Sequence, residues 1–379
     1  MVITSALLAL ALSAGDGNPI KIGGYFPLTG GYAATGTAMR NAARLAVDEV
    51  NAAGGVLGRK LVVLEADDAG SPQKAAQIVQ DYVEKEKVAA LLGPAQTGVA
   101  AASTRTANEK KVPHVVSNAV GNKVNELFKE FPDNYVFRLA ASEALQAEMM
   151  VTEAFAARGK RKPAILHDET AHGQGGRARL ASLLGTRGVK PVHEAGVKPG
   201  EDASAQVKAA KDAGADVILL FALAKEGAAV SRALEKVGWK AEVIGTSSLS
   251  SSDFTQAAGP FGEGTTLPQT VIEAGAVEPA QKAFFAAYRK AYGVERVEPA
   301  PGAAQTYDAV KLLALAMKQA GTTDGPKVKA ALEDLGETYD GATSTYFKPF
   351  GPDDHEAVSA ANMMWGELRG GQVVPQKAP

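Results

Sequence analysis

The sequence predicts an α/β protein with two doubly wound, Rossmann-like lobes. Segments with strand and helix patterns alternate along residues 20–247. The near-continuous apolar runs VAALL (88–92) and VILLF (217–221) are typical of parallel strands covered by helices on both faces. The strand–helix alternation starts again at residues 163–168, after the first array has ended. The chain of 379 residues is also longer than a single hydrophobic core usually accommodates. Two successive arrays of this kind predict two lobes.

The first array begins with a predicted strand over residues 20–28. A helix is expected over 34–55, because Met39, Ala43 and Val47 recur at helical spacing before the stop at Gly54-Gly55. Ser71 and Pro72 have the residue types of an N-cap and a first helical turn. The remaining elements are strands over 60–68, 88–93 and 112–117, a helix over 71–87, and a helix before the last strand.

The second array is followed by a different pattern. Its strands are expected over 163–168, 189–197, 216–223 and 242–247, and its helices over 175–188, 204–214 and 226–238. The C-terminal third adds helices over 280–293 and 303–321, a third helix after Gly325-Pro326, and short strands near 344–347 and 359–368. Each lobe is therefore expected to be discontinuous. Lobe one would comprise 18–139 plus 270–346, and lobe two 140–269 plus 347–379.

Composition excludes several classes of function. The chain has no cysteine, which rules out disulfides, thiolate zinc sites, a cysteine nucleophile and a lipid anchor on cysteine. The net charge of −2 and the lack of a basic block do not suggest a nucleic-acid partner. Residues 1–17 are apolar and then polar, and they resemble a secretory signal with a cleavage point near Ala14. The usual positive start is missing, so a disordered tail is the alternative.

No motif predicts a nucleotide, a metal or catalysis. GPAQTG (93–98) lacks the Lys-Ser/Thr of a phosphate-binding loop. GQGGRA (173–178), with Glu194 about twenty residues on, matches a dinucleotide pattern, but five residues are expected between its strand and its helix. The five histidines have no metal-binding spacing, and His167 is interpreted as a hydrogen-bonded residue at a strand end. Ser251 or Ser252 is interpreted as a helix cap, so neither an enzyme nor a cofactor is expected.

Small polar residues follow three strands of the first array. These segments are GGYAATG (30–36), GPAQTG (93–98) and SNAVGN (117–122). Ligands of open α/β sheets bind at the carboxyl ends of strands, where helix N-termini favour negative groups. The segments could equally be tight turns without a ligand, and the residues alone do not decide between these interpretations.

The chain also resembles a known family over nearly its whole length. Four segments carry the resemblance: 20–36 (IKIGGYFPLTGGYAATG), 46–75 (AVDEVNAAGGVLGRKLVVLEADDAGSPQKA), 90–94 (ALLGP) and 305–316 (QTYDAVKLLALA). They are similar to type I periplasmic binding proteins, in the leucine/isoleucine/valine-binding branch of ABC importer proteins. The resemblance implies two lobes joined by three crossing segments that close on a ligand. It also implies a periplasmic location, a membrane permease as partner, and a monomer.

The resemblance implies where a ligand carboxylate would bind in the first lobe. Gln96 and the Thr97 hydroxyl match positions after the third strand, and the backbone N–H groups of Ala119 and Gly121 match positions after the fourth. Thr35 would line the same wall. Gly70 and Gln96 stand where some relatives have paired cysteines, in agreement with a cysteine-free chain.

The second lobe departs from the pattern of amino-acid binders. Ser248 stands where they place an acid for the α-ammonium group, His172 stands where they place a tyrosine, and Leu223 replaces an aromatic residue. Ser248, His172 and Phe221 would offer a hydroxyl, an imidazole and an aromatic surface. A buried ammonium without a partner is costly, so an aromatic or branched organic acid is favoured over an amino acid.

Several alternatives stay open. His172 could merely cap a helix that begins at Gly173, and Glu226 or Asp168 could supply the missing anion. The whole chain could be a ligand-sensing module of a receptor or regulator, since the same fold serves both roles. An enzyme on a doubly wound scaffold is the weakest alternative, because no catalytic set is found.

Overall fold

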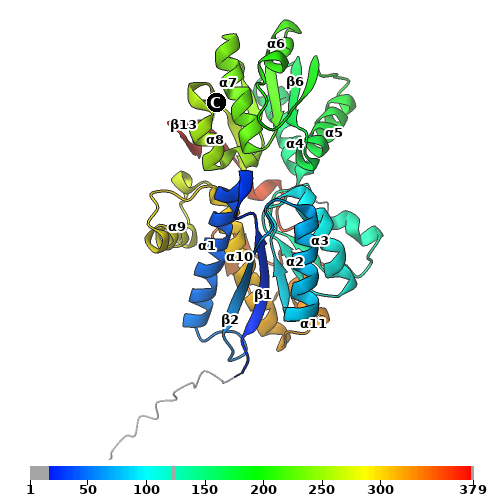
Figure 1. The fold of residues 1–379 in the computed structure, drawn as a ribbon, viewed down its shortest axis with the longest axis vertical. Helices are drawn as coiled ribbons and strands as arrows, with labels where there is room; N and C mark the ends of the chain where they lie inside the picture. Colours follow the sequence, from blue (N-terminus) through cyan, green and yellow to red (C-terminus); the bar gives the residue numbers. More distant parts are fainter. Residues whose placement is uncertain (1–16, 122–123, 377–379) are drawn as a thin grey trace, which may run out of the picture.

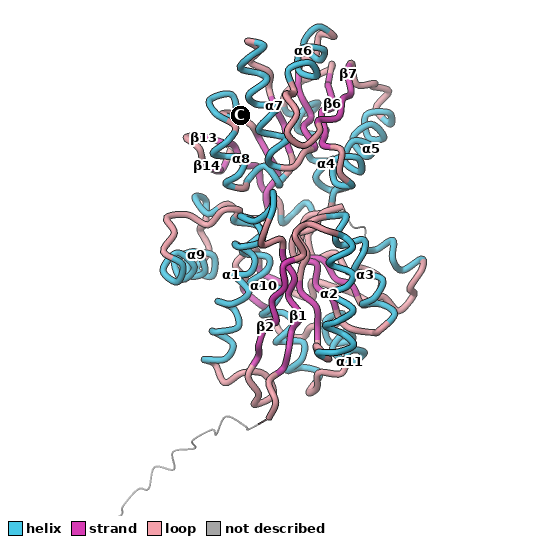
Figure 2. The backbone as a smooth tube through the Cα atoms, in the orientation of Figure 1, coloured by secondary structure: helices cyan, strands magenta, loops and turns pink. Residues whose placement is uncertain are grey.

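Two lobes, one above the other, make up the computed structural model of the chain (Figure 1), which describes residues 17–121 and 124–376. Each lobe is built around its own sheet, and the strands of both sheets are visible in the tube view (Figure 2). The expected signal-like segment, apart from residue 17, lies outside the described residues.

The first lobe has a parallel sheet in the order β2-β1-β3-β4-β5. The order reverses between β1 and β3, which makes their carboxyl ends a switch point where a crevice opens. The strands are β1 (Ile20–Phe26), β2 (Leu61–Asp67), β3 (Ala90–Leu92), β4 (His114–Val116) and β5 (Val136–Arg138).

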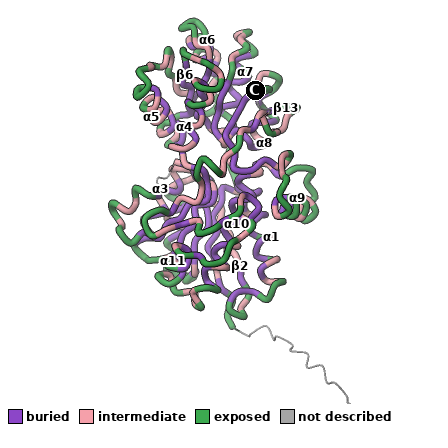
Figure 3. The backbone as a smooth tube through the Cα atoms, turned by 180° about the vertical axis from the view of Figure 1, so that it is seen from behind, coloured by how far each residue is buried: buried purple, intermediate pink, exposed green. Residues whose placement is uncertain are grey.

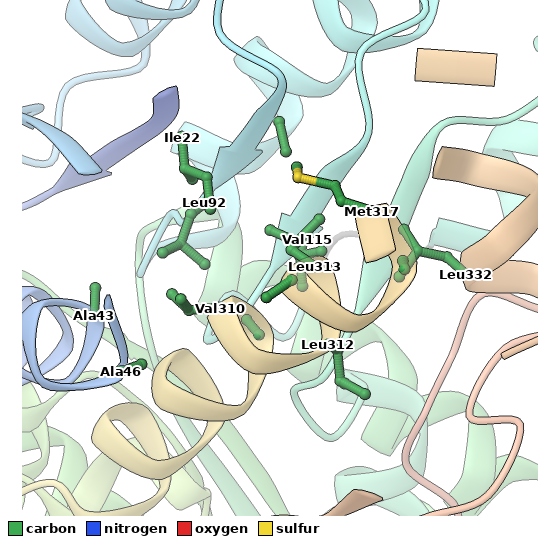
Figure 4. Packing of buried hydrophobic residues seen from close by; sticks show 14 of the residues in the cluster. Ile22, Ala43, Ala46, Leu92, Val115, Val310, Leu312, Leu313, Met317 and Leu332 are labelled. Atoms are coloured by element: carbon green, nitrogen blue, oxygen red, sulfur yellow. The ribbon is translucent and has the colours of Figure 1, made fainter. Parts of the chain in front are cut away.

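Helices cover both faces of this sheet. The early helices are α1 (Ala33–Ala52), α2 (Pro72–Asp81) and α3 (Thr97–Glu109), and the late ones are α9 (Pro279–Tyr292), α10 (Ala300–Ala320) and α11 (Gly325–Glu333). On one face, α1, α10 and α11 bury an apolar cluster against the sheet, in which Val310 and Leu313 lie near Leu92 and Val115 (Figure 4). On the other face, α2 and α3 pack against β1 and β3. The late helices thus complete the first lobe.

The second lobe has a mixed sheet in the order β14-β13-β10-β9-β8-β6-β7. The strands from β10 to β7 are parallel, whereas β13 and β14 are antiparallel additions at one edge. The strands are β6 (Pro163–Asp168), β7 (His193–Val197), β8 (Val217–Phe221), β9 (Val243–Gly245), β10 (Thr266–Gln269), β13 (Met364–Arg369) and β14 (Gln372–Pro375). The helices are α4 (Glu143–Thr152), α5 (Ala171–Thr186), α6 (Ser204–Asp212), α7 (Ala224–Val237) and α8 (Ser252–Ala257).

Strand β8 shows why the apolar runs predicted buried strands. Ile218 and Leu220 join the core under α7, whereas Val217, Leu219 and Phe221 join the core under α4 and α5. Both faces of the strand are therefore covered, and all five residues are buried. Seen from behind, buried residues follow the strands of both lobes while exposed residues lie on the outer surfaces of the helices (Figure 3).

Three connections run between the two sheets. The first joins β5 to α4, the second leaves β10 for α9, and the third leads to β13. The expected boundaries near 139/140 and 269/270 fall in the first two connections, and their exact limits stay predictions. Before the third connection, the hairpin β11 (Tyr339–Asp340) and β12 (Thr345–Tyr346) packs on α10 through Asp308, which accepts from both tyrosine hydroxyls.

The third crossing comes later than the expected boundary at 346/347. Phe350 packs against Phe137 of β5 with ring centroids 4.9 Å apart, and His355 stacks on the same ring at 3.9 Å. Arg138 N–H donates to the carbonyl of His355 at 2.8 Å, and Ala357 N–H donates to that of Arg138 at 2.9 Å. Residues up to 357 therefore extend the edge of the first sheet, because their apolar side chains complete its core.

Some elements differ from the predicted ones. The strands β5, β10 and β14 were not expected, because runs of three or four residues carry too little periodicity to be distinguished from loops. Strand β7 is shorter than the expected 189–197. Helix α5 begins at Ala171, so two residues rather than five separate it from β6.

Candidate ligand-binding site

A cavity of about 250 Å³ lies between the lobes, with residues of both in its wall. Its first-lobe wall contains Thr35, Gln96 and Thr97, and its second-lobe wall contains His172 and Ser248. These five predicted residues come from four separate segments of the sequence, and the structure brings them to one place.

The N-terminal ends of five helices meet at this cavity. The first turns of α1, α3, α5 and α10 line it, and so does Leu223, the N-cap of α7. A helix N-terminus presents free N–H groups and a partial positive charge. Thr170 and Asp168 already accept N–H groups at the starts of α5 and α7, so the ends of α1, α3 and α10 are the ones that favour an anionic group inside the cavity.

The described side chains of the wall carry no formal charge of their own. In the described part of the chain, no aspartate, glutamate, lysine or arginine lines the cavity. Burial lowers the pKa of the His172 imidazole, although the charge of Asp168 opposes the shift, so His172 is neutral near pH 7. The cavity is thus polar and attractive to an anion, but its wall has no carboxylate to neutralise a cation.

The start of α3 has the geometry of an anion anchor. The first helical hydrogen bond joins Ala100 N–H to the carbonyl of Gln96 at 2.9 Å, so the N–H groups of Thr97, Gly98 and Val99 come before it. The Gln96 side chain makes no capping bond to them. The Thr97 hydroxyl accepts from Gly121 N–H at 3.1 Å and keeps its own proton to donate.

The backbone donors expected after β4 are used within the fold. Ala119 N–H donates to the carbonyl of Pro94 at 3.2 Å, and Gly121 N–H donates to Thr97. Neither residue lines the cavity, whereas their neighbours Asn118 and Val120 do. The expectation that these two N–H groups bind the ligand does not agree with this structure, because the fold already uses both as donors.

In the second lobe, Thr170 and not His172 caps helix α5. The Thr170 hydroxyl accepts from His172 N–H at 3.2 Å, so the alternative that His172 is the cap is wrong. His172 is 5% exposed, lines the cavity, and its Nε2 has no hydrogen-bond partner among the described residues. A buried polar atom without a partner is costly, so a ligand group that reached Nε2 would gain a hydrogen bond.

Phe221 belongs to the core beside His172. It is fully buried, and its ring lies 4.8 Å from that of His172, centroid to centroid. A Cβ on Gly176 would lie 2.0 Å from the Phe221 ring, which shows how closely α5 packs on β8. Phe221 therefore packs against the His172 ring and does not line the cavity, because its side chain lies between β8 and α5.

Two acids near the cavity do not line it. Both carboxylate oxygens of Asp168 accept hydrogen bonds from the fold, including one from Leu223 N–H at 2.9 Å. Glu226 is 7% exposed, and burial raises the pKa of its carboxyl. Neither acid is in place to meet a ligand ammonium in this structure.

Sequence reasoning missed several wall residues. Tyr32 at the start of α1 lines the cavity opposite Ser248, and burial raises the pKa of its phenol while a hydrogen bond with Ser248 opposes the shift. Gln305 accepts from the Thr270 hydroxyl at 2.9 Å through its side-chain oxygen, and both residues line the cavity. Tyr32 lies in the segment GGYAATG, which indicated a possible ligand site. Gln305 opens the segment 305–316, which carried the family resemblance but no indication of a ligand site, and Thr270 lies in a segment with neither.

Two other sequence expectations have a structural counterpart. A Cβ on Gly70 would lie 2.4 Å from the Gln96 Oε1 atom, so the two positions matched to paired cysteines lie side by side. The glycines of GQGGRA lie within α5, where Gly173 and Gly176 allow close packing on β6 and β8. They do not form the strand-to-helix turn that a dinucleotide needs.

The described part of the chain has neither a metal-binding cluster nor a membrane-spanning helix. The residues that the structure describes contain no group of three or more histidine, aspartate or glutamate side chains able to hold a metal ion. Over the same residues, no helix combines the length and the apolar character needed to cross a bilayer.

Comparison with known proteins identifies the family. A family model described as periplasmic binding protein matches residues 19–372. The Leu/Ile/Val-binding protein homolog 3 of Brucella melitensis is 32% identical over 321 residues, which are 83% of each chain. The chain is a type I periplasmic binding protein of the leucine/isoleucine/valine-binding branch. The predicted family and fold class are therefore confirmed, and membership implies an extracytoplasmic location.

Solved structures place this binding protein in the same fold. The LivJ substrate-binding protein of Streptococcus pneumoniae, in complex with isoleucine, is 26% identical with a TM-score of 0.81, covering 95% of this chain and all of that one. A solute-binding protein of Rhodopseudomonas palustris BisB5, in complex with 3,4-dihydroxybenzoic acid, is 24% identical with a TM-score of 0.80, covering 94% and 95%. The relatives are transporter binding proteins rather than enzymes.

Proposed function

We propose that this periplasmic binding protein captures a small organic carboxylate between its lobes and delivers it to the membrane permease of an ABC importer. The observation that carries the proposal is the meeting of five helix N-termini around a cavity without charged side chains in its described wall. Such a wall stabilises one negative group by oriented dipoles and N–H donors. The lobes would close over the ligand, because a ligand bound by both stabilises the closed form.

The carboxylate would bind at the start of α3. Its oxygens would accept from the first N–H groups of the helix and from the Thr97 hydroxyl, with Thr35 on the same wall. Charge-assisted hydrogen bonds of this kind are short and roughly twice as strong as neutral ones. The isoleucine of the S. pneumoniae relative and the 3,4-dihydroxybenzoic acid of the R. palustris relative are both carboxylates, so this fold accommodates both classes.

The second lobe favours an organic acid over an α-amino acid. An α-ammonium group would meet Ser248 and the neutral His172, and in the described chain no carboxylate lines the cavity to pair with it. A keto or hydroxyl oxygen, in contrast, can exchange a hydrogen bond with the imidazole of His172, whose Nε2 has no partner among the described residues. The aromatic or branched 2-oxo acids are therefore the proposed ligands.

Calorimetry on matched pairs tests the ligand class. Phenylpyruvate should bind more tightly than phenylalanine, and 4-methyl-2-oxopentanoate more tightly than leucine, because only the amino acids bury an unpaired charge. Tighter binding of the amino acid in every pair would contradict the proposed ligand class and would indicate amino-acid uptake instead. Failure of every carboxylate to bind would overturn the anion anchor itself.

Delivery to a permease needs a separate test. Cells that lack this chain should lose uptake of the bound acid from dilute medium, and a copy of the wild-type gene should restore it. Unchanged uptake in the deletion strain, with purified protein that still binds the acid, would instead favour a sensing role.

A further inference from the structure

A buried hydrogen-bonded network lies beneath the start of α3. It consists of Tyr25 on β1, Ser103 on α3 and His114 on β4, all of which are fully buried. His114 Nε2 lies 2.9 Å from the carbonyl oxygen of Gly93 and 3.0 Å from the Tyr25 hydroxyl. The Tyr25 hydroxyl in turn lies 2.7 Å from Ser103 Oγ. Three separate elements of the first lobe are thus connected by side chains alone.

The direction of each hydrogen bond follows from its acceptors. A carbonyl oxygen can only accept, so the proton of His114 must reside on Nε2, which faces Gly93. Burial lowers the pKa of His114 to about 4, so the ring is neutral at physiological pH. Ser103 Oγ lies 3.0 Å from the carbonyl of Val99 and 3.1 Å from that of Ala100, and both can only accept. Ser103 therefore donates to these carbonyls and accepts from Tyr25.

The two ends of this network are at the anion anchor. Gly93 opens the loop that leads to α3, and Val99 lies in the first turn of α3 and lines the cavity. Gly93 N–H donates to Val115 at 3.1 Å, so both backbone groups of this glycine are fixed from β4. Its φ is +114°, and a Cβ at this position would lie 2.4 Å from the Tyr25 carbonyl oxygen, so only glycine fits here.

We infer that His114 and Tyr25 are positioning residues for ligand capture, which aim the N–H groups at the start of α3 into the cavity. This inference rests on the proposed function, because it assigns the network to the carboxylate anchor. Hydrogen bonds to an anion depend on donor direction, so a small rotation of the loop weakens them. Without the His114 donor, the buried Gly93 carbonyl would lack a hydrogen bond. The loop would then rotate to a position where this carbonyl accepts from another donor.

A matched pair of substitutions separates positioning from packing. His114→Gln keeps an N–H donor at the end of a side chain of similar reach, whereas His114→Leu fills the space without a donor. We expect phenylpyruvate affinity to fall at least about tenfold in His114→Leu and to stay within about threefold of wild type in His114→Gln. Tyr25→Phe keeps the ring and removes only the hydroxyl that links His114 to Ser103, so it is a milder third variant, with an expected loss of about threefold.

Hydrogen exchange gives a readout that needs no ligand. In His114→Leu, the amides of residues 93–100 should exchange at least about tenfold faster than in wild type, and those of α10 should not change. Equal affinity and equal exchange in the Gln and Leu variants, with a common fall in melting temperature, would overturn the inference and leave a packing role. If no carboxylate binds wild type but the exchange difference is found, the proposed function fails while the positioning of the loop stands.

Discussion

Leu223 N–H donates a hydrogen bond to Asp168 Oδ2 at 2.9 Å, and this contact joins the carboxyl ends of β6 and β8. The other oxygen of Asp168 accepts from Thr170 N–H at 2.7 Å and from Gly173 N–H at 3.3 Å. One buried carboxylate therefore fixes the starts of both α5 and α7, which form part of the second-lobe wall of the cavity.

Asp168→Asn should destabilise the protein and weaken ligand binding. An amide has one acceptor oxygen, so one set of these N–H donors would face an NH2 group. We expect a loss of about 1–3 kcal/mol in the free energy of unfolding. Urea denaturation measures it, and Asp212→Asn, at an exposed position on α6, is the control that should leave stability unchanged. Wild-type stability in Asp168→Asn would refute this role.

Thr97→Val should reduce affinity for the bound acid. The change keeps the shape of the side chain but removes the hydroxyl that would donate to the carboxylate and that accepts from Gly121. We expect a loss of about 1.5–3 kcal/mol, which is roughly tenfold to a hundredfold in the dissociation constant. Thr97→Ser retains the hydroxyl and should stay close to wild type by calorimetry. Equal affinity of the valine variant would exclude Thr97 from the anchor.

Ser248→Glu should shift the preference towards amino acids. Ser248 lines a cavity whose described wall has no acid, so a carboxylate there would give an α-ammonium group its missing partner. We expect the phenylalanine-to-phenylpyruvate affinity ratio to rise by at least about tenfold. Ser252→Glu, outside the cavity wall, is the control. A ratio that does not move would show that Ser248 does not face the α-substituent.

Asp68→Asn should stabilise the protein in a pH-dependent way. Asp68 is fully buried and one of its oxygens has no partner among the described residues, and burial raises the pKa of its carboxyl to about 6. Because the folded state holds this proton more tightly than the unfolded state, wild type loses stability as pH rises from about 4 to about 6.

The asparagine variant lacks this titration and keeps the bond from Gly70 N–H. Its advantage should be about 1–3 kcal/mol at pH 7.5 and should shrink as pH falls towards 4. Urea denaturation at several pH values checks both the size and the sign. An advantage that is independent of pH would show that the charge of Asp68 is not responsible.

The sequence by itself determined the type of fold and the kind of site. Apolar runs such as VILLF require burial on both faces, and this requirement already specifies parallel strands between helices. The small residues after β1 and β3 likewise indicated where a ligand could approach the main chain, and Thr35, Gln96 and Thr97 do line the cavity. These features are local, since they depend on residue type and spacing within a few turns of chain.

Only the tertiary structure decided which residues line the cavity. Ala119 and Gly121 donate their N–H groups within the fold, while Asn118 and Val120 line the cavity. Gln305 reaches the same cavity from a helix more than two hundred residues after Gln96. Such choices depend on how distant elements pack and on which hydrogen bonds the fold has already used, and sequence spacing carries neither.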